Sequence, residues 1–121
     1  MTTFAGARAE LIAAMAGVGH GATSAVGRIN PPCIYIAGDG AAIDHVTIGK
    51  HASTWRLVLV AGKFDADSSA GELDTLKQGA IAALRALDGW RLEPLGRDGI
   101  RTFAGAELLT AELRGVRMID T

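Results

Sequence analysis

The spacing of hydrophobic residues predicts two amphipathic helices, the first of them at the N-terminus. From Thr3 to about Met15, apolar side chains recur every three or four residues, as they do on the buried face of a helix. Thr2 and Thr3 are candidate N-caps. The apolar residues of this face are Phe4, Ala7, Leu11, Ile12 and Met15. We therefore expect an N-terminal helix that packs on a core.

The second predicted helix begins near Ser69. Ser69 and Glu72 have the spacing of a capping box, and Asp65 and Asp67 favour the positive end of a helix. Apolar residues then recur at helical spacing over four turns at Leu73, Leu76, Ala80, Ala83, Leu84 and Leu87. An Asp-Gly pair follows directly, and we expect it to end the helix.

Two strands are predicted between these helices. Residues 33–37 follow Pro31-Pro32, which favour an extended chain, and they are rich in strand formers. Residues 53–63 alternate strictly and carry apolar side chains on both faces. We expect the second of these strands to be central in a sheet.

The C-terminal third of the chain predicts two or three further strands. Residues 90–94 and 100–103 flank an Arg-Asp-Gly turn, which is typical of a hairpin. From residue 108 the alternation shifts frame across Arg114-Gly115, a pattern that predicts a bulge. The chain is therefore expected to end in a long, bent strand.

Two segments lack regular spacing and predict loops. Residues 17–27 contain four glycines in eleven positions, which favours a mobile loop. Residues 38–52 also predict a connecting loop, with 46–48 briefly extended.

The order of elements predicts a single α+β domain over residues 1–121. We expect a mixed, mostly antiparallel sheet of about four to five strands with two helices packed on it. The residues predicted to share one core are Trp55, Leu57, Leu59, Leu73, Leu76, Leu84 and Leu113.

Composition narrows the class of protein. The 121 residues suit one domain, and 12 Lys and Arg against 13 Asp and Glu give a net charge of -1. This balance disfavours nucleic acid as the main partner. No apolar run approaches the ~20 residues that span a bilayer, and the N-terminus lacks a basic leader. We expect a soluble protein that stays in the cytoplasm where it is made and has no membrane partner.

The residues that most often ligate metals or act as nucleophiles have the wrong number or spacing. A single cysteine, Cys33, excludes an internal disulfide and a thiolate zinc cage, and its neighbours indicate a buried packing role. His20, His45 and His51 lack the i, i+4 spacing of a helical zinc site, so we interpret them as loop residues. Trp55 is more consistent with a core or interface role than with ligand stacking, as is Trp90.

Two further patterns, one of glycines and one of aspartates, do not fit the binding motifs that they resemble. The glycines at 17–21 follow a helix and lead toward prolines, whereas a phosphate-binding loop follows a strand and opens a helix. Asp65 and Asp67 resemble the start of a calcium loop, but Ala70 and Leu76 replace its glycine and its bidentate glutamate. We expect no catalytic residues, no cofactor and no metal.

The whole layout resembles the tail terminator proteins of long-tailed, siphovirus-type bacteriophages. The closest-matching pieces are the paired prolines before the strand Cys33-Ile34-Tyr35-Ile36, the Ser53-Thr54-Trp55 start of the central strand, and Gly105-Ala106-Glu107 before the last one. The similarity covers nearly the full chain, and it is a similarity of layout rather than of one motif.

The resemblance implies a structural virion protein at the head-tail junction. Such a protein forms a hexameric ring that caps the tail tube, stops tube polymerisation and joins the tube to the head-side connector or stopper. Inside the ring, loop arginines such as Arg28 or Arg97 would make weak, nonspecific contact with DNA. Three other interpretations stay open: another small head-tail joining protein, a homodimeric ferredoxin-like ligand-binding module, and a small enzyme whose site forms at a subunit boundary.

The predicted loops supply candidate subunit-interface residues. Residues 38–52 and 62–68 are long or charged connections that the core does not require, so we expect them to contact other subunits. The polar residues expected at such contacts are Lys50, His51, Lys63, Asp65 and Asp67.

Overall fold

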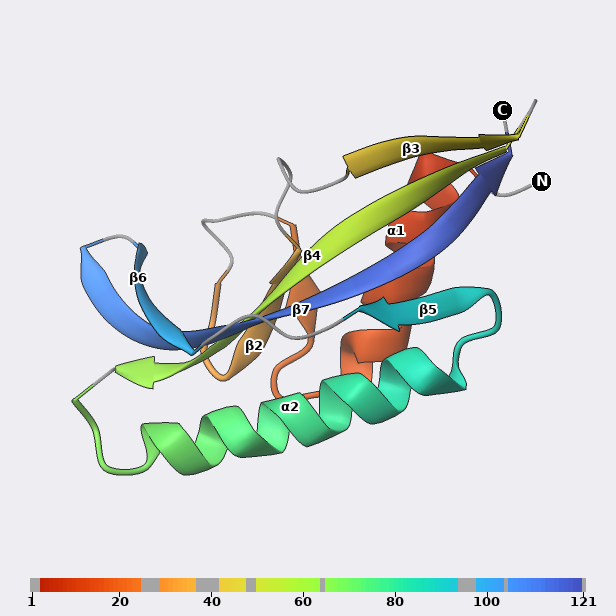
Figure 1. Ribbon diagram of the computed structural model, residues 1–121. Helices are drawn as coiled ribbons and strands as arrows, with labels where there is room; N and C mark the ends of the chain where they lie inside the picture. The colour runs from red at the N-terminus through yellow and green to blue at the C-terminus, as the bar shows by residue number, and fades with distance from the viewer. Residues whose placement is uncertain are drawn as a thin grey trace.

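Two long antiparallel strands, β4 and β7, form the centre of the molecule (Figure 1). β4 spans Lys50–Lys63 and β7 spans Ala106–Asp120, and they pair along nearly their whole length with one register shift near the end of β4. The computed structural model describes residues 3–24, 29–36, 42–47, 50–63, 65–93, 98–103 and 105–120. Apart from the backbone, nothing is described of residues 42–47, 50 and 120.

Short strands extend the sheet beyond the outer edges of both long strands. They are β1 (Ala22–Thr23), β2 (Cys33–Ile36), β3 (Ala42–Thr47), β5 (Trp90–Glu93) and β6 (Gly99–Phe103). β2 and β3 pair with successive parts of β4, while β6 and β5 pair with successive parts of β7. β1 is parallel to β2, and every other pairing among the described residues is antiparallel. The predicted α+β class with a mixed, mostly antiparallel sheet is confirmed, although the described residues form seven strands rather than four or five.

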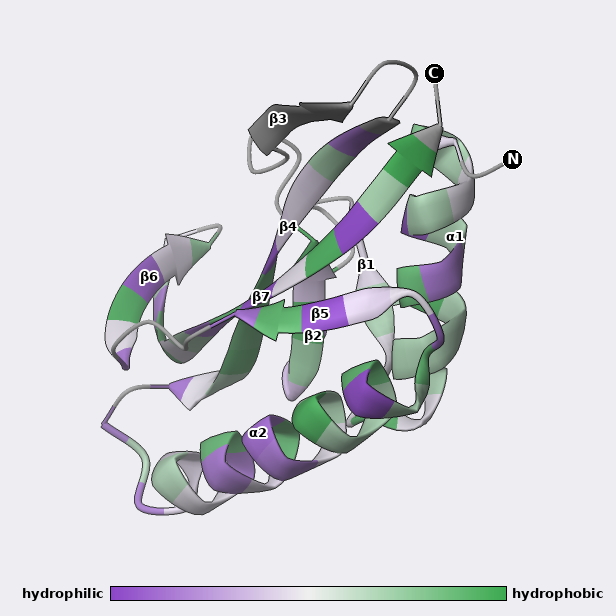
Figure 2. Ribbon diagram, turned by 45° about the vertical axis from the view of Figure 1, so that its right-hand side comes forward, coloured by the Kyte–Doolittle hydropathy of each residue, from purple (hydrophilic) through white to green (hydrophobic). Residues whose placement is uncertain are grey.

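Both helices pack on one face of the sheet (Figures 1 and 2). α1 spans Phe4–Ala14 and continues into the 3₁₀ turn η1 (Met15–Gly17), while α2 spans Ser69–Ala86. The Thr3 side chain accepts a hydrogen bond from the Gly6 amide at 3.0 Å, so the predicted N-cap is confirmed. Buried side chains of both helices meet those of β2, β4 and β7 in one cluster. All seven predicted core residues belong to this cluster, because each lies on the apolar face of its element.

A smaller apolar cluster lies on the other face of the sheet. It is formed by Cys33, Val58, Val60 and Leu108, and the partly buried rings of Tyr35 and Phe103 pack against it. The ring centroids of Tyr35 and Phe103 lie 6.0 Å apart, edge to face. These rings belong to β2 and β6, which are separated by β4 and β7, so the sheet must curl for them to meet. Figure 1 shows this curl at the β6 end of the sheet.

The predicted loop at residues 38–52 is wrong where the structure describes it. Ala42–Thr47 form β3, which pairs antiparallel with the first residues of β4, and His45 lies opposite His51. Both histidines are therefore strand residues and not loop residues. The ladder with β4 stabilises this strand, although the sequence lacks sustained hydrophobic alternation there.

The predicted C-terminal hairpin has the wrong partners. β5 and β6 do not pair with each other; β6 pairs with Ala106–Thr110 of β7 and β5 with Arg114–Arg117. β7 has 15 residues, so its edge is long enough for both short strands. Because β5 pairs with β7 and not with β6, Trp90 and Leu92 of β5 pack against the main core.

The predicted bulge at Arg114-Gly115 is absent. The register with β4 continues through Gly115, which lies opposite Trp55, and shifts instead near Lys63 and Leu108. Gly115 lacks a side chain because a Cβ atom there would lie 3.1 Å from Trp90 and 3.2 Å from Leu84. The hydrophobic alternation along β7 changes frame in the sequence because Gly115, on the helix-covered face, has no side chain, whereas Val116, on the other face, is apolar.

The predicted capping box is also wrong. The N-cap of α2 is Ser68, and its hydroxyl donates to the Glu72 carboxylate at 3.2 Å. The Ser69 hydroxyl instead donates to the Lys63 carbonyl at 2.6 Å. Because it bonds to the end of β4, Ser69 fixes the start of the helix against the sheet.

Part of the glycine-rich segment is docked on the sheet. The His20 amide donates to the Pro32 carbonyl at 2.7 Å, and the Ile34 amide donates to the Gly21 carbonyl at 3.0 Å. Gly19 has a φ of 57°, and a Cβ atom there would lie 2.5 Å from the Pro32 oxygen. This close approach requires glycine at position 19. The predicted loop is wrong at Ala22 and Thr23, which form β1. Residues 25–27 lie outside the described part of the chain.

We predict that Leu84→Ala lowers the free energy of unfolding by about 2–5 kcal/mol, because it leaves a cavity beneath α2. Leu84 is 1% exposed and lies in the main core. Urea unfolding followed by circular dichroism measures the change. Gln78→Ala, at an exposed position of the same helix, is the control and should change stability by less than about 0.5 kcal/mol. Equal losses in the two variants would contradict the placement of Leu84.

We predict that Gly115→Val destabilises the fold by about 1–3 kcal/mol, because its side chain would overlap Trp90 and Leu84. Gly99→Val is the matched strand control, since no atom lies within 4 Å of a Cβ placed at Gly99. Thermal unfolding of both variants distinguishes crowding from a general effect of replacing a strand glycine. A Gly115→Val variant as stable as the control would show that β7 does not pack as described.

Candidate interaction surface

The predicted interface residues separate into two groups at opposite ends of β4. Lys50 and His51 begin the strand, whereas Lys63 ends it and Asp65 and Asp67 follow directly. A strand of this length spans about 40 Å at ~3.3 Å per residue. The structure therefore brings Lys63, Asp65 and Asp67 together and places Lys50 and His51 elsewhere.

Asp65 and Asp67 lie in the turn between β4 and α2, which we call the acidic turn (residues 65–68). Its backbone is fixed because the Ala66 amide donates to the Lys63 carbonyl and the Ser69 amide donates to the Ala66 carbonyl. Asp65 and Asp67 are exposed, and no cation of the described residues pairs with either carboxylate. The acidic turn therefore presents two carboxylates to solvent.

The acidic turn is not a calcium loop. The Ser69 side chain, which would be the third ligand of the sequence pattern, is 1% exposed and bonded to the Lys63 carbonyl. Across the described residues, no three His, Cys, Asp or Glu side chains converge as metal ligands. The two aspartates are surface charges at the start of a helix.

A second charged surface lies on the face of the sheet opposite the helices. One oxygen of Glu112 accepts a hydrogen bond from the Nε of Arg56 at 3.0 Å and another from the Nε of Arg114 at 2.9 Å. Arg56 and Glu112 are partly buried, with side-chain exposures of 26% and 20%, while Arg114 is 50% exposed. A single carboxylate is thus shared by two guanidinium groups.

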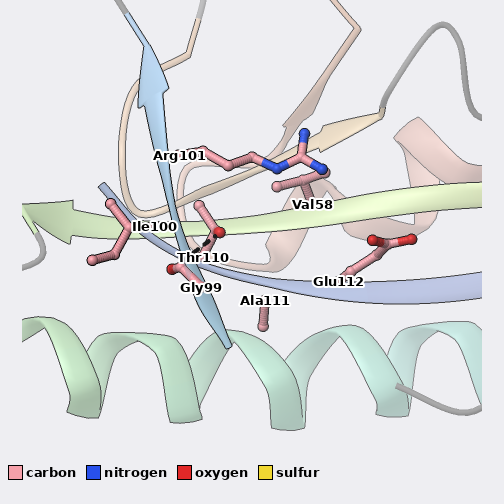
Figure 3. A pocket seen from close by; sticks show the side chains of 7 residues that line it. All are labelled: Val58, Gly99, Ile100, Arg101, Thr110, Ala111 and Glu112. Atoms are coloured by element: carbon pink, nitrogen blue, oxygen red, sulfur yellow. Dashed lines mark hydrogen bonds between the residues drawn. The ribbon is translucent and has the colours of Figure 1, made fainter. Parts of the chain in front are cut away.

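Arg101 extends this surface at a cavity between β6 and β7. The cavity has a volume of about 150 Å³ and is lined by Val58, Gly99, Ile100, Arg101, Thr110, Ala111 and Glu112. Figure 3 shows the Arg101 side chain reaching over Val58 on the side of the sheet where Glu112 lies, while Ala111 points toward α2. The wall is held by the Thr110 hydroxyl, which donates to the Gly99 carbonyl at 3.3 Å. We call Arg56, Arg101, Arg114 and Glu112 the arginine face.

The arginines determine the ionisation of Glu112. Partial burial acts to raise the pKa of the Glu112 carboxyl, but the hydrogen bonds and positive charges of Arg114 and Arg56 outweigh burial. The net result is a pKa below the ordinary glutamate value, so Glu112 is ionised at neutral pH and the arginine face has three cations against one anion.

Cys33 and His20 lie apart from both charged surfaces. Burial raises the pKa of the Cys33 thiol, and a hydrogen bond with the Asn30 backbone offsets this only in part. The thiol is 3% exposed, in agreement with the predicted packing role. His20 bonds through Nδ1 to the Asn30 carbonyl at 3.0 Å. Neither residue has the partners of an activated nucleophile among the described residues.

Both tryptophans have structural roles, as predicted. The Trp55 indole donates to the Ser53 hydroxyl at 2.9 Å, and the Arg8 guanidinium lies 5.5 Å from its ring centroid. The Trp90 indole donates to the Glu10 carboxylate at 2.7 Å, which ties β5 to α1. Their polar atoms are used inside the fold rather than offered to a ligand.

Sequence reasoning missed the arginine face because its members come from three strands. Arg56 belongs to β4, Arg101 to β6, and Glu112 with Arg114 to β7. The feature of the sequence that could have predicted this face is the presence of charged residues at alternate positions of strands that are otherwise apolar. Only the register of β4 with β7 shows that Arg56 lies opposite Arg114 and next to Glu112.

The sequence matches no protein-family model and no curated protein at a significant level. In the part of the chain that the structure describes, no helix is both long and apolar enough to cross a membrane.

We predict that Glu112→Gln removes an acid-dependent part of the stability. A carboxyl whose pKa is lowered by folding stabilises the native state above its ordinary pKa, and this stabilisation is lost as the pH falls through the folded-state value. At neutral pH the variant should be less stable by about 1 kcal/mol, and the difference should shrink as the pH falls below the ordinary glutamate pKa. Urea unfolding of the variant and the native protein, at neutral pH and at successively lower pH, measures this difference in the free energy of unfolding.

Glu107→Gln is the matched control for this experiment. Glu107 is exposed near the start of the same strand, and no described cation pairs with it. If the Glu112 variant kept the pH dependence of the native protein, the arginines would not be stabilising its carboxylate.

Proposed function

We propose that this chain is a bacteriophage tail terminator. In this role it is a structural virion protein that forms a hexameric ring at the head-tail junction, with no catalytic step and no cofactor. The ring caps the tail tube, stops the addition of tube subunits and contacts the head-side connector or stopper. The proposal rests on the layout resemblance described above.

The observation that carries the proposal furthest is the difference between the two lateral edges of the sheet. One edge consists of β3 and of β2 with β1, and the other of β5 and β6. A cyclic ring joins identical subunits through two different surfaces, whereas a two-fold dimer uses one surface twice. A small domain with two unlike edges and two unlike charged surfaces is suited to the first arrangement.

The predicted interface residues would take part in two separate contacts of the ring. Lys63, Asp65 and Asp67 remain candidate interface residues as one group, and His51 with the backbone of Lys50 would belong to a separate contact at the other end of β4. Contact with DNA in the ring lumen would be weak and nonspecific. Arg28 and Arg97, the arginines considered for it, lie outside the described residues.

The test combines the purified chain with polymerising tube protein of the phage that encodes it. We expect one ring of six copies at one end of each tube, and tubes that stop growing in proportion to the amount of chain added. The Leu84→Ala variant, which should be destabilised, serves as the control. Unaffected tube growth, or single copies along the outer tube wall, would contradict the proposal.

The same experiment separates the alternatives. A ring that binds the head-side connector but not the tube would indicate another head-tail joining protein. A two-fold dimer with no affinity for either would indicate the ligand-binding class.

A further inference from the structure

We infer that the acidic turn of one subunit binds the arginine face of its neighbour. This inference deepens the proposed ring, on which it rests, by naming the two surfaces that meet. The occupant of the arginine face is therefore a second copy of this chain.

The arginine face is suited to an additional carboxylate. Arg56 and Arg114 share the Glu112 carboxylate, and Arg101 lines the adjoining cavity, so the arginine face holds three guanidinium groups and one carboxylate among the described residues. The Arg114 side chain remains 50% exposed while it bonds to Glu112 through Nε, so solvent and an incoming carboxylate have access to it. Guanidinium groups bind carboxylates through charge-assisted hydrogen bonds, often in pairs. The cavity beside Arg101, of about 150 Å³, gives an incoming side chain room to approach.

The acidic turn supplies the complementary charge. Asp65 and Asp67 are exposed and have no cation partner among the described residues. Asp74 in α2 is a further carboxylate that is 77% exposed, and the Lys77 ammonium lies 4.0 Å from it. This end of the molecule is therefore negative, although Lys63 adds one positive charge.

The two surfaces cannot meet within one subunit. The acidic turn leads into α2, which packs on one face of the sheet, whereas the arginine face lies on the other. The neighbours of Glu112 in β7, Ala111 and Leu113, belong to the helix-side core, so Glu112 must point to the opposite side. Complementary surfaces separated by the sheet of their own subunit can pair only between subunits.

Charge also favours a second copy over nucleic acid. Three guanidinium groups are well below the roughly 6–10 phosphate contacts typical of strong DNA binding. The whole chain has a net charge of -1, so subunits do not strongly repel one another. An acidic surface that pairs with a different, basic surface is a head-to-tail contact, which closes into a ring when the rotation between subunits allows it.

A charge-exchange experiment tests this contact. The variants are Asp65→Lys with Asp67→Lys, Arg101→Glu with Arg114→Glu, and all four changes together. Sedimentation over a concentration series measures the dissociation constant for self-association. Each double variant should raise this constant about tenfold, and the fourfold variant should recover most of the loss because the charges are exchanged.

Two single changes provide matched controls on the surface of α2 and just beyond it. Arg85→Glu and Asp88→Lys alter charge at exposed residues outside both surfaces and should leave self-association unchanged. Circular dichroism shows whether each variant is folded. If the native chain assembles and the double variants assemble equally well, or the fourfold variant stays as weak as the doubles, the contact is wrong and the ring proposal stands. A native chain that stays monomeric, both alone and on tubes, would overturn both.

A cysteine cross-link gives a second measurement that does not depend on charge reversal. Cys33 is the only native cysteine and is buried, so it gives little background. With mild oxidant, a variant with Asp67→Cys and Arg101→Cys should form a ladder of linked chains longer than dimers. Neither single variant should extend beyond dimers. No ladder from the double variant under conditions where the native chain assembles would contradict the contact.

Discussion

The antiparallel pairing of β4 with β7 is the constraint on which the rest of the structure depends. Strands in globular proteins usually have about 5–6 residues, whereas these have 14 and 15. Their length lets each long strand carry two short strands on its outer edge, and it separates the two ends of the molecule. One close contact in this pairing, Gly115 opposite Trp55, makes room for Trp90 and Leu84 beneath the sheet.

The period of two along these strands assigns different tasks to the two faces. Odd-numbered residues of β4 such as Trp55, Leu57 and Leu59 pack against the helices. Even-numbered residues on the opposite face include Val58 and Val60, which pack under the curled end of the sheet, and Arg56, which binds Glu112. Stability therefore comes mainly from the helix-covered face, while the other face can hold charge at its middle without loss of the core.

The sequence predicts the parts of the fold that have a strong local period. Both helices, their buried faces and the central strand follow from spacings of three, four and two residues. The partners of β5 and β6 could not be predicted in this way, because either strand could pair with any neighbour of suitable length. Ser69 shows a similar limit: its hydroxyl has the choice between a capping bond and the Lys63 carbonyl, and only the position of β4 decides.

The candidate surface was predicted only in part for the same reason. Lys63, Asp65 and Asp67 are close in sequence and lie together, but Lys50 and His51 are separated from them by the length of β4. Arg56, Arg101 and Arg114 are distant in sequence and come together only through the register of the sheet. Short-range patterns therefore found the acidic turn and missed its proposed partner.

The most direct test of the account is an electron cryomicroscopy map of the assembled protein on a tail tube. We expect a six-fold ring in which the turn at Asp65 and Asp67 of each subunit lies against Arg101 and Arg114 of the next. A map with two-fold dimers, or with isolated copies on the tube wall, would contradict it.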